Sequence, residues 1–220
     1  MITNPFTILA PFNDRLQVAL FTKDDDIHSD EQLSQVLNIQ NVAGLHQVHG
    51  NRTIRISGTL ARTEEADGMI TYQENLMLTV RTADCQPFII FVPDKKILGV
   101  IHAGWRGLIA GVIPNFFKVL DIEPQHTFVA AGPSLCKTCS EFGYPEAEIS
   151  KIGTEFIDGT YVDLQGAAES QLFELGVLQK NLERHPDCTR CNPEKYWTYR
   201  GGDKEAVLEG HTNVMACWLS

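Results

Sequence analysis

The chain has 220 residues, of which 43% are hydrophobic, and this is enough to bury one substantial core. Its formal net charge of -10 repels phosphate backbones and anionic lipid surfaces, so we expect neither a nucleic-acid partner nor a membrane partner. No internal repeat, biased tract or linker divides the sequence, which predicts a single domain over residues 1–220.

The beginning of the chain does not resemble an export signal. Residues 1–13 carry no Lys or Arg and contain Pro5 and Pro11, whereas a secretory signal begins with basic residues and continues as an unbroken apolar run. We therefore expect a soluble, cytoplasmic protein. The reducing cytosol would keep its 6 cysteines as thiols, which serve as core residues, metal ligands or nucleophiles.

Apolar runs and turn residues predict a mixture of strands and helices. In chain order these are a strand at 17–22, a helix at 30–37 with Ser29 as its N-cap, strands at 45–48, 53–56, 76–82, 87–92 and 97–102, a helix after Gly104, a strand at 127–131, helices at 145–157 and 167–182, and a strand at 196–200. Pro114 should kink or divide the helix that follows Gly104. The pattern indicates a mixed α+β or layered α/β domain.

Three polar strings stand at the ends of otherwise apolar strands. They are Gln47-Val48-His49-Gly50, Thr82-Ala83-Asp84-Cys85 and His102-Ala103-Gly104-Trp105-Arg106-Gly107. His46 and His49 would face opposite ways on a strand, and we select His49 because it lies at the turn. Two imidazoles and one thiolate suit zinc and leave its fourth position open, as catalytic sites require. We therefore predict a catalytic metal site at His49, Cys85 and His102.

These strings, together with Ala66-Asp67-Gly68-Met69-Ile70-Thr71, resemble the ordered signatures of the YfiH family. This family is also called the laccase-domain or polyphenol oxidase family, and it includes multifunctional purine nucleoside phosphorylases. Gly132-Pro133-Ser134-Leu135 and the Tyr199-Arg200 region extend the resemblance over most of the chain.

The resemblance implies a single-domain α/β/β/α sandwich and a zinc ion bound by His49, Cys85 and His102, with copper able to replace zinc. It implies phosphorolysis of adenosine, inosine, guanosine or methylthioadenosine, and deamination of adenosine. A zinc with three protein ligands lowers the pKa of bound water toward ~7, which suits deamination. Cys85, Asp84 and His102 are the catalytic candidates, although Asp84 is as compatible with a structural role as with proton transfer.

Phosphorolysis also requires a group that holds an anion beside the sugar. Arg106 is the candidate, because it lies in a turn that opens a helix, where backbone N–H groups favour anions. Gln47, Thr82 and Arg200 are assigned with it to the binding of substrate or phosphate. The family tends to have two consecutive arginines near the C-terminus and later a Gly-Arg, whereas this chain has Arg200-Gly201 and later Gly210-His211.

Two further cysteine pairs, Cys136-X-X-Cys139 and Cys188-X-X-Cys191, stand outside these strings. Together they would form a four-thiolate structural zinc site, but the two pairs are 49 positions apart (188 − 139), much more than the ~15–20 intervening residues of a compact zinc ribbon. The sequence therefore favours the alternative of two separate loop pairs of reduced thiols over a shared zinc site.

Three other functions stay open at this point. Cys85 and His102 would serve as nucleophile and base in a metal-free hydrolase or amidase acting on a cell-wall precursor. A copper-dependent polyphenol oxidase is disfavoured, because the 7 histidines include no His-X-His pair for a multi-histidine copper cluster. A module that binds a nucleoside without turnover is the third. The preferred nucleoside, and the choice between monomer and homodimer, are left open by the sequence.

Overall fold

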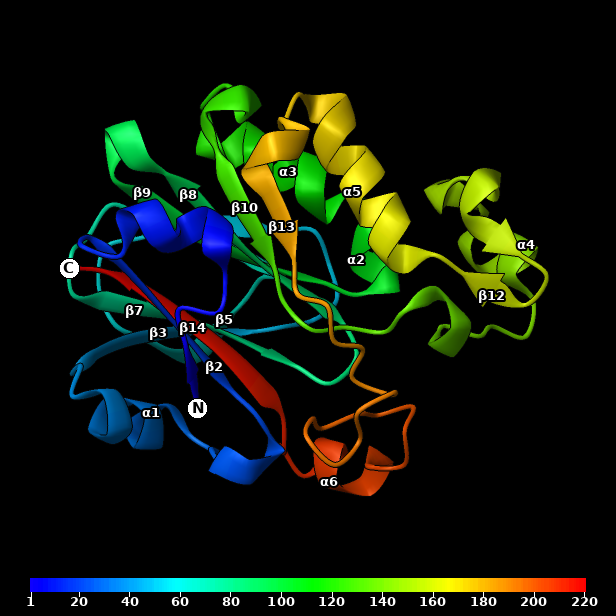
Figure 1. Cartoon of the computed structure of the whole chain (residues 1–220), viewed down its shortest axis with the longest axis horizontal. Helices are drawn as coiled ribbons and strands as arrows, with labels where there is room; N and C mark the ends of the chain where they lie inside the picture. The colour runs from blue at the N-terminus through cyan, green and yellow to red at the C-terminus, as the bar shows by residue number, and fades with distance from the viewer.

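Two mixed β-sheets packed face to face form the centre of the computed structural model, which describes residues 1–220 (Figure 1). The first sheet has the order β1 (Ile2–Thr3), β2 (Leu16–Phe21), β14 (Asn213–Leu219), β7 (Leu76–Thr82), β3 (Asn41–His46) and β5 (Leu60–Glu65). The second has the order β13 (Leu182–Arg184), β10 (Phe128–Ala131), β8 (Gln86–Val92), β9 (Ile97–Ala103), β6 (Gly68–Thr71) and β4 (Thr53–Ile56).

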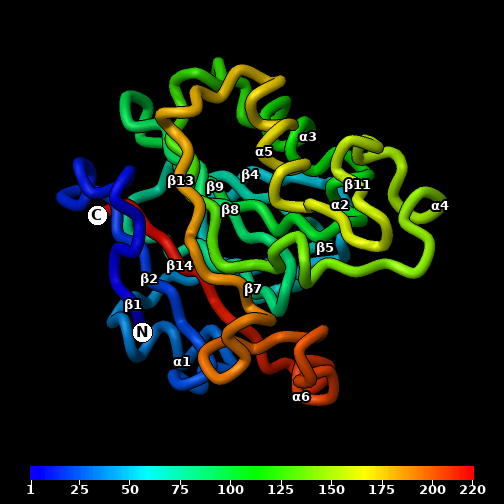
Figure 2. The backbone as a smooth tube through the Cα atoms, turned by 45° about the vertical axis from the view of Figure 1, so that its right-hand side comes forward, coloured from blue at the N-terminus to red at the C-terminus, as the bar shows by residue number.

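Helices cover the outer face of each sheet. The helix α1 (Asp30–Leu37) packs on the first sheet, and α2 (Trp105–Ala110), α3 (Val112–Leu120) and α5 (Leu164–Leu175) pack on the second (Figures 1 and 2). The shorter elements α4 (Pro145–Ile149), β11 (Ile157–Asp158) and β12 (Tyr161–Val162) project from one side. The α/β/β/α sandwich that the resemblance implied is confirmed.

The central strands are apolar throughout because they are buried on both faces. In β8, Phe88 and Ile90 point to the core under the helices, while Ile89 and Phe91 point to the core between the sheets. Alternate residues of a strand face opposite sides, so a strand inside a four-layer sandwich needs no polar side. Full burial of each such side chain contributes about 1.5–3 kcal/mol relative to exposure.

Several predicted elements are confirmed. The strands predicted at 53–56 and 76–82 are β4 and β7, and the helix predicted at 30–37 is α1. Ser29 caps α1, because its hydroxyl accepts a hydrogen bond from the Gln32 backbone N–H at 3.2 Å. The Ser29 N–H in turn donates to the side-chain oxygen of Gln32 at 3.0 Å, which completes a capping box.

The prediction of a strand at 196–200 is wrong. This segment is a loop, in which Tyr196 is fully buried and donates its hydroxyl to Asp187 at 2.8 Å. Tyr196 is buried by packing of side chains rather than by strand pairing, while Trp197 is partly buried and Tyr199 is exposed. The C-terminal strand β14, which was not predicted, lies inside the first sheet between β2 and β7.

Two predicted helices need different boundaries. The helix after Gly104 is divided, but the break lies at Gly111, whose φ of 79° ends α2, and Pro114 falls in the first turn of α3. The helix predicted at 167–182 ends at Leu175, because Gly176 adopts a left-handed conformation.

The helix predicted at 145–157 ends at Ile149, where α4 is followed by short 3-10 turns. The last leucine of the pattern predicted at 167–182, Leu182, instead begins strand β13. In both segments the apolar spacing continues past the point at which the regular helix stops.

The chain passes from one sheet to the other between β7 and β8. Only Ala83, Asp84 and Cys85 separate these strands, and Asp84 has a φ of 91°. The tight crossover brings Cys85 to the end of the sandwich where the two sheets meet.

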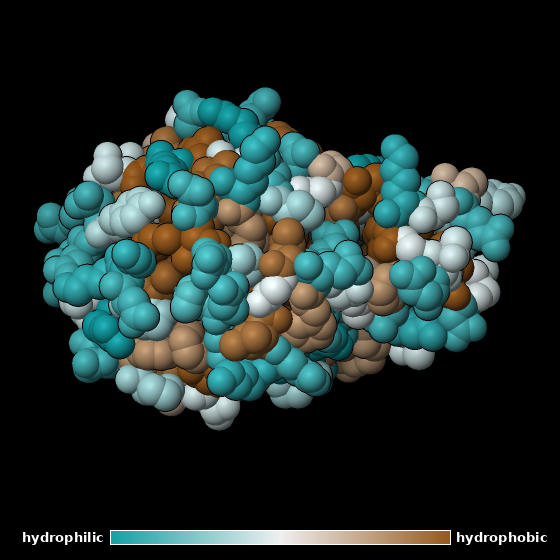
Figure 3. All heavy atoms as spheres, turned by 90° about the horizontal axis from the view of Figure 1, so that it is seen from above, coloured by the Kyte–Doolittle hydropathy of each residue, from teal (hydrophilic) through white to brown (hydrophobic).

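Hydrophilic residues cover most of the face seen from above Figure 1, and hydrophobic residues show between them in patches (Figure 3). None of the helices is long and apolar enough to span a lipid bilayer.

Candidate metal centre

His49, Cys85 and His102 converge at the end of the sandwich although they lie on three separate segments. One potential ligand atom of each residue lies within 4.8 Å of those of the other two. His49 follows β3 of the first sheet, Cys85 lies in the crossover, and His102 belongs to β9 of the second sheet. The site therefore exists only where the two sheets are packed together.

The loop that carries His49 is held by backbone and side-chain bonds. Gln47 donates its amide to the Arg81 carbonyl at 2.7 Å and accepts from the Arg81 N–H at 2.9 Å. This side chain thus continues the pairing of β3 with β7 after the backbone has left the sheet. His49 has a φ of 59°, which reverses the chain, while His46 is exposed at the end of β3. The structure brings His49 rather than His46 into the cluster.

A buried carboxylate, Asp67, connects the two histidines, and it was not among the predicted site residues. Its Oδ1 accepts from the ring of His102 at 2.8 Å and from the His49 N–H at 3.0 Å. Its Oδ2 accepts from the Gly50 N–H at 2.6 Å. Burial alone would raise the pKa of Asp67, but these donors, with His102 foremost, hold the pKa below its usual value.

The bond to Asp67 also fixes the tautomer of His102. An ionised carboxylate can only accept, so Nδ1 of His102 carries the proton and Nε2 remains for a ligand or a transferable proton. Ligand histidines in metal sites are usually oriented in this way. A single Asp between a small residue and a glycine, as in Ala66-Asp67-Gly68, was the sequence signal for this role.

Cys85 and His102 influence each other strongly. Burial alone would raise the pKa of the Cys85 thiol, but His102 and His49 beside it lower the pKa to about 6. Burial alone would lower the pKa of His102, whereas Cys85 and Asp67 raise it to about 9. Without a metal, the favoured state near neutral pH is a thiolate beside an imidazolium.

Gly104 leaves the space that this cluster occupies. A Cβ atom at this position would lie 2.8 Å from the Cys85 Sγ and 3.0 Å from the His49 Cδ2. Both contacts are too short for a side chain to be added without moving the sulfur or the ring. The glycine of the His102-Ala103-Gly104 string is thus required by close packing, since its φ of -80° suits any residue.

Asp84 is buried and all of its hydrogen bonds hold distant segments. Its Oδ1 accepts from the hydroxyls of Thr189 at 2.7 Å and Thr198 at 2.6 Å, and its Oδ2 accepts from the Arg200 N–H at 2.7 Å. Three donors on one carboxylate favour the structural alternative over proton transfer. The geometry makes Asp84 a positioning residue for the adjacent Cys85.

The remaining predicted residues differ in whether their side chains are free to bind a ligand. Arg106 is exposed, makes no ion pair and stacks on the Trp105 ring at 4.3 Å. The guanidinium of Arg200 instead binds the Glu141 carbonyl and lies 4.6 Å from the Phe142 ring. Thr82 is buried at the end of β7, where its carbonyl accepts from Asn213. Only Arg106 presents a free charged group.

The chain belongs to a known family. A family model described as multi-copper polyphenol oxidoreductase laccase matches residues 10–216. A purine nucleoside phosphorylase of Rickettsia prowazekii is 33% identical over 177 residues, covering 76% of this chain and 73% of the relative. A purine nucleoside phosphorylase of Aquifex aeolicus is 34% identical over 164 residues, covering 74% of this chain and 78% of the relative.

Solved structures share the fold. The hypothetical protein YfiH of Bacillus licheniformis superposes with a TM-score of 0.79 at 19% identity and covers 99% of this chain and 100% of that one. YlmD of Geobacillus stearothermophilus gives a TM-score of 0.70 at 21% identity over 86% of this chain and 77% of that one. The chain is thus a member of the laccase-domain family, the family of the YfiH proteins.

The first prediction concerns the Cys85 thiol in metal-free protein. Because its pKa is lowered to about 6, the reactive thiolate is present above that pH and is lost as the pH falls through it. Alkylation of Cys85 should therefore show a midpoint near pH 6, measured as the difference between wild type and Cys85→Ala. Asp67→Asn should move the midpoint upward. An ordinary thiol midpoint in the wild type would contradict the geometry.

The second prediction concerns Gly104→Ala. The added methyl group should displace the Cys85 sulfur or the His49 ring and weaken zinc binding by about ten-fold or more, as changes next to metal ligands do. Titration with a competing chelator measures this. Gly58→Ala is the matched control, because a Cβ at Gly58 meets nothing within 4 Å. Equal zinc affinity in the two variants would disprove the close packing.

Proposed function

We propose that the chain is a zinc-dependent purine nucleoside phosphorylase that acts on adenosine, inosine, guanosine or methylthioadenosine and also deaminates adenosine. The observation that carries the proposal is the convergence of His49, Cys85 and His102. The names of the relatives from Rickettsia prowazekii and Aquifex aeolicus support the phosphorylase reaction.

The donor set fits a zinc ion. One sulfur and two imidazole nitrogens are borderline-soft ligands, and three protein ligands leave a position for substrate or water. The Asp67 carboxylate behind His102 is the partner expected behind a ligand histidine. A zinc ion held by these residues supplies Lewis-acid chemistry to the reacting centre.

The side chains around the centre serve the two reactions differently. In phosphorolysis a phosphate oxygen bonds to the ribose C1′ while the bond to the purine nitrogen breaks, and the departing base takes up a proton. Arg106 is free to bind the phosphate. In deamination water adds to C6 of adenosine and ammonia leaves. Nδ1 of His102 is bonded to Asp67 and its Nε2 would bind zinc, so we propose that His102 holds the zinc ion that would activate this water.

Gln47, Thr82, Asp84 and Arg200 belong to this proposal mainly as supports. The side chains of Gln47 and Asp84 and the guanidinium of Arg200 bond to protein groups in this structure. We propose that they position the crossover and the His49 loop, and that Arg106 provides the contact with phosphate. The chain has no consecutive arginine pair near its C-terminus, so this single arginine carries more of the phosphate binding.

A metal-free hydrolase or amidase is the second candidate, and one observation favours it. Asp67 orients His102, and His102 lies beside a Cys85 thiol of lowered pKa. An orienting acid, a base and a nucleophile in this order are the arrangement of cysteine hydrolases. Such an enzyme would keep its activity in the presence of a chelator, whereas the proposed phosphorylase would lose it.

Copper binding at the same three ligands is compatible with the donor set, but laccase chemistry requires further copper sites. A multicopper oxidase adds a cluster of several histidines. The other two groups of potential ligands in this structure are four cysteines and the set Asp26, His28 and His211. Neither group supplies such a cluster, so elemental analysis is expected to find zinc in the active protein.

The third prediction tests this proposal with Cys85→Ala. Loss of the thiolate leaves two imidazoles, so zinc should be lost from this centre along with phosphorolysis and deamination of adenosine. The melting temperature should change little, because the cores on both sides of the second sheet do not depend on the metal. Elemental analysis, thermal melting and product assays with and without phosphate measure these outcomes.

The results separate the alternatives. Full zinc occupancy with no activity would make Cys85 a nucleophile and favour the hydrolase. Persistent activity would exclude both mechanisms. A nucleoside that shifts the melting temperature of the wild type without any product would instead indicate a binding module.

The fourth prediction concerns Arg106→Gln. Removing the charge should raise the KM for phosphate about ten-fold, or more, because a hydrogen bond to a charged group contributes about 1.5–3 kcal/mol. Deamination of adenosine, which uses no phosphate, should be nearly unchanged. Lys118→Gln, which removes an exposed charge in the last turn of α3, is the control. An unaltered KM for phosphate would exclude Arg106 from phosphate binding.

A further inference from the structure

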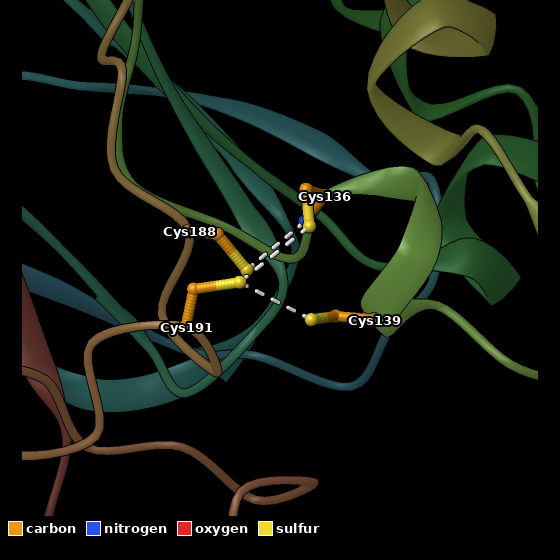
Figure 4. A group of neighbouring side chains, drawn as sticks. All are labelled: Cys136, Cys139, Cys188 and Cys191. Carbon is orange, nitrogen blue, oxygen red and sulfur yellow. Dashed lines mark hydrogen bonds between the residues drawn. The ribbon is translucent and has the colours of Figure 1, made fainter.

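A second cluster of potential ligands lies outside the metal centre. Cys136 precedes a short 3-10 turn, Lys137–Cys139, that Cys139 ends, and Cys188 and Cys191 lie in the loop that follows β13. The four sulfur atoms lie within 4.8 Å of one another. In Figure 4 the two pairs approach from separate segments and all four side chains point into the same small space.

The distances fit a metal ion better than disulfide bonds. Cys139 Sγ lies 3.5 Å from Cys191 Sγ, and Cys136 Sγ lies 3.9 Å from Cys191 Sγ. Four zinc–sulfur bonds of about 2.3 Å in a tetrahedron place the sulfurs about 3.8 Å apart, whereas a disulfide requires about 2.05 Å. The backbone N–H of Cys136 points at the sulfur of Cys188 at 3.2 Å, as a donor to a charged thiolate does.

The burial of these cysteines does not suit a role as core residues. Cys191 is exposed, Cys136 and Cys139 are only partly buried, and Cys188 alone of the four is buried, whereas Cys217 lies fully buried in the core between the sheets. Three of the four thiols thus reach the surface and lie beside one another, which suits the ligands of a cation better than core residues.

We propose that Cys136, Cys139, Cys188 and Cys191 bind a structural zinc ion. Four thiolate ligands close the coordination sphere, so this site leaves no position for substrate and differs in kind from the centre at Cys85. The long separation of the two pairs along the sequence is no obstacle, because the fold itself places the segments side by side. Ser134 and Cys188 form a parallel β-bridge, and the Thr189 N–H donates to the Ser134 carbonyl at 3.2 Å.

The ion would clamp the two segments that hold Asp84. From the first segment, the Leu135 N–H donates to the Asp84 carbonyl at 3.1 Å. From the second, Thr189 and Thr198 donate their hydroxyls to the Asp84 carboxylate. Since Asp84 precedes Cys85, the proposed zinc stabilises the loop pair that fixes the crossover.

The fifth prediction counts zinc in purified full-length protein and in variants. Wild type should contain two zinc ions per chain, and Cys191→Ser and Cys139→Ser/Cys191→Ser should contain one. Cys85→Ala should also contain one, and Cys217→Ala should keep both. Cys191→Ser and Cys139→Ser/Cys191→Ser should melt at a lower temperature than wild type at equal zinc concentration, because the metal no longer joins the segment of Cys136 to the segment of Cys188.

A measurement on wild-type protein tests the proposal even if the variants fail to fold. Protein stripped of zinc and loaded with cobalt should show the sulfur-to-cobalt absorption of a four-thiolate site, far stronger than one thiolate gives. Zinc content unchanged in Cys191→Ser, iron in place of zinc, or disulfides between these cysteines in the native protein would overturn the proposal. Loss of zinc in Cys191→Ser but not in Cys85→Ala would support it and contradict the catalytic centre.

Discussion

The candidate metal centre depends on one buried carboxylate. Asp67 accepts hydrogen bonds from the His102 ring and from the backbone of His49 and Gly50, so a single side chain holds the His49 loop against the strand that carries His102. A buried carboxylate without donors would be costly, and its three donors come from the parts that the site needs. The bond between Asp67 and His102 also sets the tautomer of His102 and keeps Asp67 ionised. One interaction thus decides both the position and the charge of these two side chains.

Asp84 plays the corresponding part for Cys85. It lies in the crossover between the sheets with a φ of 91°, a conformation that few residues other than glycine adopt, and its carboxylate is bonded by Thr189, Thr198 and the Arg200 N–H. These bonds over-determine a strained turn, as is common at functional sites. Asp67 and Asp84 together hold the three candidate metal ligands, and Asp84 also connects them to the segment of the four cysteines.

The phosphate binding that we propose requires positive charge to be concentrated locally in this acidic chain. With a formal net charge of -10, the chain repels anions at long range, and several of its arginines are engaged by carboxylates or carbonyls. Arg106 is an exception, being exposed beside the turn that follows His102. Our proposal therefore assigns the recognition of phosphate to a short-range contact at the metal centre.

The sequence by itself determined which residues are candidates for the site, because His49, Cys85, His102 and Arg106 lie in short strings that local turn signals mark. It also determined elements defined by local patterns, such as α1 with its Ser29 cap. Only the tertiary structure decided the role of Asp67, the bonding of Asp84, the loop at 196–200 and the convergence of the four cysteines. Each of these depends on contacts between segments distant along the chain, which no local spacing encodes. Packing of the two sheets brings those segments together. The sheets pack because burial of their apolar faces is favourable, but the apolar strands resemble one another in sequence, so their pattern does not tell which segments will meet.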